Sequence, residues 1–167
     1  DNHKLDIKYQ IGDDAYTTNY SEIYGYGSTW APTGEDSEYH YTVNELNSLL
    51  TAAYTWNINE EWTLDALIGN EFVDKKTKYE YAYSMNFNFP GWNHLNNASV
   101  FSNESQYNKK RTVGNFANLS VAWKNMLYLS GSIRNDIVSS MPRDNRSFTY
   151  PSVSLGFIFT ELAPDRK

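Results

Sequence analysis

The chain contains no cysteine, only three histidines and no long apolar run. Without cysteine it can form neither a disulfide nor a thiolate metal site, and it has no cysteine nucleophile. His3, His40 and His94 are isolated, and none has a second ligand at metal-binding spacing. No stretch approaches the roughly 18 apolar residues that a membrane helix needs. Any membrane crossing would therefore use β-strands, whose hydropathy is weak because every second residue faces the lumen.

The charge balance and the absence of catalytic motifs exclude further classes of function. The formal net charge is -6, so the basic face that nucleic-acid binding requires is absent from the composition. No Gly-x-Ser-x-Gly motif or P-loop is present, and no carboxylates are forced into an acid–base pair. The acidic run Glu35, Asp36, Ser37 and Glu38 lacks the ordered Asp/Asn-Gly spacing of a calcium loop. We therefore predict no catalytic residue, no metal site and no cofactor.

Aromatic residues and period-two alternation are what the sequence does offer. Aromatics make up 16% of the chain, with 14 tyrosines, and their rings suit places that are apolar at one end and wet at the other. Alternating apolar positions indicate half-exposed strands. These lie within residues 5–11, 50–58, 62–68, 79–89, 113–123, 127–133 and 153–159. A 3.6-residue spacing over residues 43–53 also fits a helix, but the alternation that continues through Trp56 favours a strand.

The connections alternate between short and long. Residues 57–61 and 124–125 predict short turns, whereas residues 25–44, 90–109 and 139–148 predict long polar loops. Short turns on one side and long loops on the other are typical of an outer-membrane barrel. We predict six long strands that run alternately up and down. Two alternatives stay open: a soluble, aromatic-rich, carbohydrate-binding β-sandwich, and a complete small structural barrel.

The parity of the apolar positions changes within two of these segments. Apolar residues are odd-numbered from Leu5 to Ile11, but the tyrosines that follow from Tyr16 are even-numbered. The same change separates residues 62–68 from residues 79–89. Such a change requires a bulge or a turn if one face stays apolar throughout. Gly12, Asp13 and Asp14 are the candidate position for either.

Residues 46–162 resemble the SusC/RagA family of TonB-dependent outer-membrane transporters. The long, ordered similarity covers residues 124–136, 139–142, 145–148 and 150–162, which match the family run KNMLYL…GRNDWSS.LP…NRSFFYPSVS..F.FSEL. Weaker landmarks lie at residues 46–56, 64–69 and 89–92. The family often has tryptophan after its Arg-Asn-Asp, where this chain has Ile137. Residues 1–45 match only loosely.

The resemblance implies an all-β fold: an antiparallel transmembrane segment of a 22-stranded barrel with a plugged lumen. It implies import of glycan fragments or peptides across a bacterial outer membrane, beneath a SusD-like surface lipoprotein and with energy supplied through TonB. The plug and the TonB-coupling region would lie outside these residues, so we expect residues 1–167 to be part of a single barrel domain. The polar, proline-containing end at residues 160–167 also favours a segment over a complete barrel.

Two sets of residues are candidates for function. Aromatic residues in the expected loops could stack on sugar rings, although a membrane-boundary girdle or loop packing also explains them. Trp30 and Trp92 are the best candidates because each lies beside Pro or Gly in a polar loop, and Tyr24 and Tyr26 follow. The second set is Arg134, Asn135 and Asp136, which end a strand. They could contact plug or substrate at the rim, but we favour a role in fixing register and terminating the strand.

Overall fold

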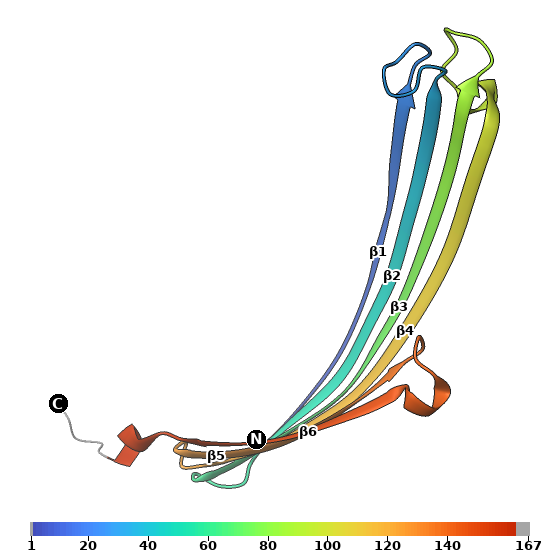
Figure 1. Cartoon of the computed structure of the whole chain (residues 1–167). Coiled ribbons are helices and arrows are strands. Elements are labelled where there is room, and N and C mark those ends of the chain that lie inside the picture. The colour runs from blue at the N-terminus through green and yellow to red at the C-terminus, as the bar shows by residue number, and fades with distance from the viewer. Residues whose placement is uncertain (1, 163–167) are drawn as a thin grey trace. The chain divides into compact units, whose positions relative to one another are not determined.

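The computed structural model describes residues 2–162 and contains six strands joined into one sheet in the order β1-β2-β3-β4-β5-β6 (Figure 1). The strands are β1 (His3–Tyr24), β2 (Glu35–Asn57), β3 (Trp62–Phe87), β4 (Ala98–Trp123), β5 (Leu127–Val138) and β6 (Ser147–Phe157). Three short 3₁₀ turns, η1 (Leu95–Asn97), η2 (Arg143–Asn145) and η3 (Phe159–Leu162), complete the elements. The all-β antiparallel prediction is confirmed.

Residues 2–162 form none of the alternative structures that the sequence left open, namely a helix over residues 43–53, a two-sheet sandwich or a closed small barrel. Residues 43–53 lie within β2, so the helical alternative is wrong. One sheet of six strands is not a two-sheet sandwich, and its edges are β1 and β6, so the sheet is not closed. None of the helices among these residues is long and apolar enough to cross a membrane. Residues 163–167, on which part of the argument for an incomplete barrel relied, lie outside the described residues.

The two short turns form where the sequence placed them. Asn59 accepts hydrogen bonds from the backbone N–H groups of Glu61 and Trp62, both at 2.9 Å, and so closes the β2–β3 turn. Lys124 and Asn125 have φ values of 52° and 53°, and Met126 N–H donates to the Trp123 carbonyl at 2.9 Å. Two central residues with positive φ define the hairpin turn whose twist matches that of antiparallel strands.

The long connections are shorter than the sequence suggested. They comprise residues 25–34, 88–97 and 139–146, because β2 begins at Glu35, β4 at Ala98 and β6 at Ser147. The expected loops at residues 35–44 and 98–109 are strands in which polar residues outnumber apolar ones, and the alternation of Tyr39, Tyr41 and Val43 is too short to stand out as a strand signal. Tyr39 and Tyr41 are therefore strand residues, and Tyr24 is the last residue of β1.

The chain divides into two compact units. Unit 1 contains the residues up to Gly12, Leu46–Asp74 and the residues from Lys110 onward; unit 2 contains Asp13–Glu45 and Lys75–Lys109. Unit 1 therefore holds both short turns, β5 and β6, and unit 2 holds the loops at residues 25–34 and 88–97.

Neither β1 nor β3 needs the turn or bulge that the change of parity suggested. β1 is uninterrupted through Gly12, so a hairpin there is excluded. Within unit 1, His3 pairs with Tyr54, and within unit 2, Asn19 pairs with His40. Each contact joins an odd-numbered residue of β1 to an even-numbered residue of β2. A bulge between the two contacts would insert one residue and would make an odd-numbered residue face an odd-numbered one, so the strands contain no such single insertion there. The premise that one parity stays apolar along a whole strand was wrong.

In unit 1 one parity of every strand is apolar over four successive positions, whereas the other parity is mixed. We call these positions the apolar belt: Leu5, Ile7, Tyr9, Ile11; Leu50, Ala52, Tyr54, Trp56; Trp62, Leu64, Ala66, Ile68; Ala117, Leu119, Val121, Trp123; Leu127, Leu129, Gly131, Ile133; and Pro151, Val153, Leu155, Phe157. Several of its large side chains are more than half exposed, up to 79% for Val153.

The belt has an aromatic end and a polar end. At the end with the short turns, the rings of Trp62 and Trp123 lie 6.2 Å apart. At the other end, polar residues take over the same parity. Asn70 donates to Asn115 at 2.8 Å, and Asn135 donates to Thr149 at 2.9 Å. The opposite parity of β5 and β6 carries polar side chains, including the pair Ser130 and Ser154 at 2.6 Å.

Candidate functional site

A continuous surface of tyrosines lies on three neighbouring strands of unit 2. Tyr39 of β2 is its centre: its ring lies 5.6 Å from Tyr20, 4.5 Å from Tyr81 and 6.5 Å from Tyr79. Tyr81 in turn lies 6.3 Å from Tyr83. Together with Tyr16, Tyr24 and Tyr41 we call this set the tyrosine face. Period-two alternation puts these residues on one side of their strands, because successive side chains point to opposite faces.

Carboxylates border the tyrosine face. The Tyr24 hydroxyl donates to Glu22 at 2.7 Å, which raises the Tyr24 pKa. Burial and then Glu35 raise the pKa of Tyr83, and burial and then Glu104 raise that of Tyr79. Among the described residues, no lysine or arginine forms an ion pair with Glu22, Glu35 or Glu104.

The phenols of Tyr24, Tyr79, Tyr81 and Tyr83 have raised pKa values and so stay neutral at physiological pH. Burial first, and then the Tyr39 hydroxyl, raise the pKa of Tyr81 to about 12. Lys75 lies 2.9 Å from Glu45, and its pKa is raised by Glu45 first and to a smaller extent by Tyr16 and Tyr41. The surface therefore offers ring faces and neutral hydroxyls within a negative electrostatic field.

The loop residues 88–97 carry a second aromatic group. Trp92 stacks between Phe89, at 5.8 Å and 14°, and His94, at 5.2 Å and 13°. Buried Asn97 fixes this loop by donating to the carbonyls of Phe89 and Trp92, both at 2.7 Å. Trp92 itself is 45% exposed, so one part of its ring system remains available.

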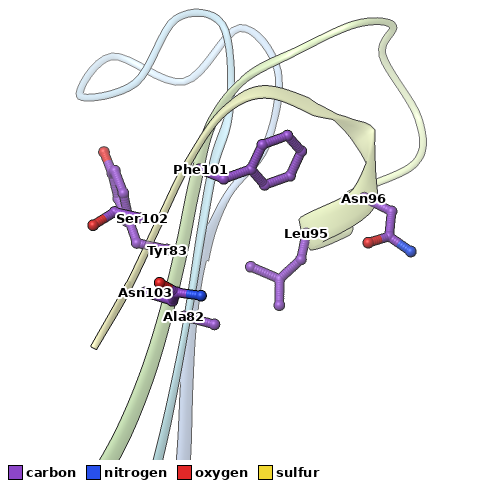
Figure 2. Close-up of a pocket in the computed structure, with 7 residues that line it drawn as sticks. All are labelled: Ala82, Tyr83, Leu95, Asn96, Phe101, Ser102 and Asn103. Atoms are coloured by element: carbon purple, nitrogen blue, oxygen red, sulfur yellow. The ribbon is translucent and has the colours of Figure 1, made fainter. Parts of the chain in front are cut away.

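A shallow pocket of about 270 Å³ lies beside η1 (Figure 2). Leu95 and Phe101 project into it, and Ala82 and Asn103 line its lower part. Tyr83 and Ser102 project to the other side of the strands in the same view. Tyr83 and Ser102 also belong to the lining of the pocket, which therefore borders the part of β3 that carries Tyr83 of the tyrosine face.

The candidates from the sequence are dispersed in unit 2. Trp30 is 87% exposed in the loop at residues 25–34, and no ring contact with it is found among the described residues. Tyr26 is half exposed in the same loop, and Tyr24 belongs to the tyrosine face. Sequence reasoning did not identify Tyr20 or Tyr81 as site residues. The alternating tyrosines at 79, 81 and 83 were a usable signal, since they share one side of β3.

The rim residues of unit 1 form an ion-pair network. Arg134 donates to Asp136 at 2.9 Å and, two strands away, to Glu71 at 2.6 Å. Asn135 points the other way and donates to Ser147 and Thr149 of β6. All three side chains thus bond within the sheet, and they lie inside β5, which continues to Val138 rather than ending with them.

Two glycines make that network possible. A Cβ on Gly114 of β4 would lie 2.7 Å from both Arg134 Nη2 and Asp136 Oδ1, so Arg134 reaches β3 across a position without a side chain. The ring of Phe116 lies against Gly69 in the same way and has the Arg134 guanidinium 5.8 Å above it. Small strand residues here permit the close approach of larger side chains.

No metal site is apparent in residues 2–162, where no three His, Cys, Asp or Glu side chains converge. The acidic run at residues 35–38 belongs to β2, so its successive side chains alternate between faces and cannot converge as a calcium loop does. Asp36 is only 2% exposed, and burial, followed by the nearby Glu38, raises its pKa.

Comparison with solved structures gives the fold a close counterpart. The chain matches the structure titled "Structure of the RagAB peptide transporter" with a TM-score of 0.88 and 24% identity, over 97% of this chain and 19% of that one. The fold is that of a barrel segment of RagAB. The RagAB peptide importer also matches in its "closed-closed" and "open-open" states, with TM-scores of 0.84 and 0.85, 24% identity and 98% of this chain covered.

The likeness confirms the resemblance to the SusC/RagA type at the level of fold. The chain spans 19% of the length of those solved chains. The matched proteins are transporters by title. No protein-family model matches the chain. No curated protein matches it either.

Proposed function

We propose that the chain is a wall segment of a TonB-dependent importer of nutrient oligomers in a bacterial outer membrane. The observation that carries this proposal is the apolar belt, an exposed band that ends in tryptophans on one side and in polar pairs such as Asn70 and Asn115 on the other. A water-soluble domain buries such a face against a second layer. An outer-membrane wall leaves it to lipid between interfacial girdles.

The change of parity between the units supports the same proposal. A strand that leaves the bilayer passes from lipid into water, so its outward side chains no longer need to be apolar. Long strands with apolar residues on one parity in unit 1 and tyrosines on the other parity in unit 2 suit a wall that extends beyond the membrane. A crossing itself takes only about 9 to 11 residues.

The open edges of β1 and β6 call for further strands. Unpaired backbone groups at a sheet edge are not tolerated in lipid, so a wall must continue until it closes. We propose that these residues belong to a single barrel domain whose other strands and plug come from the rest of a longer protein. The likeness to RagAB chains, of which this chain covers 19%, supports that arrangement.

The partners we propose follow from the same likeness. A SusD-like surface lipoprotein would cover the end with the long loops, and TonB would act through a region outside these residues. The belt would contact the lipid and lipopolysaccharide of the outer membrane. The substrate would be a glycan fragment or a peptide, which the tyrosine face or the Phe89, Trp92 and His94 stack would contact.

Uptake by cells tests the proposal. Cells that carry the full-length protein should accumulate a labelled oligomer, and an uncoupler of the inner-membrane proton gradient should abolish that accumulation. Deletion of the protein should have the same effect as the uncoupler. Recovery of the protein in the soluble fraction, or uptake that is unaffected by both treatments, would contradict the proposal.

A further inference from the structure

The tyrosine face combines two properties that favour one class of ligand. Its centre is a set of ring faces around Tyr39, and its border carries Glu22, Glu35 and Glu104 without a cationic partner. Aromatic ring faces attract cations through their quadrupole, with tyrosine among the better rings. Carboxylates that are not neutralised add a longer-range attraction of the same sign.

We propose that the tyrosine face binds cationic peptide segments, through lysine or arginine side chains seated over its rings and beside its carboxylates. This inference rests on the proposed import function and names the substrate class of that site. A neutral glycan would stack on Tyr39 or Tyr81 and could donate hydroxyl hydrogen bonds to the carboxylates, but it would leave their charge uncompensated. An anionic glycan would be repelled by them.

The local charges show how the selectivity would arise. Lys75, whose charge interacts with Tyr16 and Tyr41, is held 2.9 Å from Glu45 and is thus paired away from the border carboxylates. Because the pKa of Tyr81 is raised to about 12, its phenol adds hydrogen-bonding capacity without a charge of its own. A guanidinium or ammonium group is thus the complement of the surface, since it satisfies carboxylate and ring together.

The opposite parity of the same strands supplies a matched control. Glu38 of β2 lies 3.9 Å from His40, and Glu80 of β3 is paired with Lys78 at 2.8 Å. Their positions alternate with Tyr39 and Tyr81, so they lie on the other side of the strands. Replacing Glu38 and Glu80 by glutamine removes carboxylate charge from unit 2 and leaves the tyrosine face unchanged.

The test measures peptide binding by the purified full-length transporter in detergent. The probes are a Gly/Ser peptide bearing lysines and the same peptide with every lysine acetylated. We expect the lysine peptide to bind more tightly, and the combined E22Q, E35Q and E104Q variant to weaken its binding about tenfold, with each exposed carboxylate contributing modestly. The acetylated peptide should bind both proteins alike, and the E38Q and E80Q variant should match the wild type.

Other outcomes would overturn the inference. Equal affinity for the lysine and acetylated peptides would do so, as would an equal loss in the E38Q and E80Q variant. Stronger binding of a neutral oligosaccharide that is lost in Tyr81→Leu would assign the face to glycans. In each case gradient-dependent uptake, measured separately, decides whether the importer function stands without this substrate class.

Discussion

Gly69→Ala is the substitution whose effect follows most directly from the packing in unit 1. The added Cβ would lie 2.6 and 2.7 Å from Cε2 and Cε1 of Phe116, whereas carbon atoms pack best about 3.5 to 4.0 Å apart. The ring must therefore move by about 1 Å, away from the glycine and from the Arg134 guanidinium above it. Overpacking of this kind costs about 1 to 3 kcal/mol.

Hydrogen exchange of the full-length transporter measures this cost locally. Amides in the peptides that contain Gly69 and Phe116 should exchange about 5- to 150-fold faster, since each 1.36 kcal/mol is a factor of ten. Gly131→Ala is the matched control, because the atom nearest its new Cβ is the Ser152 carbonyl oxygen at 4.0 Å, an ordinary contact. It should leave exchange unchanged or slow it slightly.

A double-mutant cycle separates the clash from other effects of alanine. In a Phe116→Ala background the ring is gone, so Gly69→Ala should lose most of its cost. The reasoning fails if Gly69→Ala exchanges no faster than Gly131→Ala. It also fails if the cost of Gly69→Ala is the same with and without the Phe116 ring.

Three further predictions concern the belt, the rim and the loop. Leu129→Arg in the belt should lower the free energy of unfolding by about 2 to 4 kcal/mol, whereas Asn135→Arg at the polar end of the belt should lower it by at most about 1 kcal/mol. The measurement is the folded, heat-modifiable fraction of the full-length protein in lipid vesicles. Arg134→Met should lower the thermal midpoint in detergent by an amount equal to about 1 kcal/mol, because its ion pairs are partly exposed; no change would mean that the network does not hold the rim. Because the pKa of Asp36 is raised in the folded state, its protonated carboxyl contributes stability at low pH. The contribution is complete at pH values below the ordinary pKa of 3.8 and is lost as the pH rises through the folded-state pKa. Exchange near the loop at residues 88–97, corrected for intrinsic rates, should therefore speed up across that window, and Asp36→Asn should abolish the dependence.

The strands that meet the membrane in our proposal were the part most accessible from sequence. Leu127, Leu129 and Ile133 alternate with serines, and Lys124 with Asn125 marks a tight turn, so strands, faces and turn could all be read locally. The segment from Glu35 to Asn44 was taken for a loop because it is mostly polar and its alternation is limited to Tyr39, Tyr41 and Val43. The extent of the long loops was overestimated for that reason.

The sites depend on register, which alternation does not supply. Arg134 meets Glu71 across Gly114, a contact between residues 63 positions apart that only strand pairing brings together. The tyrosine face likewise needs Tyr20, Tyr39 and Tyr81 on three aligned strands. The sequence analysis looked for aromatic contacts in loops and ranked Trp30 and Trp92 first, because each lies beside Pro or Gly in a polar loop.

A single-cysteine scan along β5 tests the central claim that the belt faces lipid. The chain has no native cysteine, so spin labels can be placed one at a time in the full-length protein in vesicles. We predict that labels at Leu127, Leu129 and Ile133 are accessible to oxygen dissolved in lipid, and that labels at Ser130 and Ser132 are accessible to a water-soluble relaxation agent. Equal access of the water-soluble agent to both sets would contradict the account.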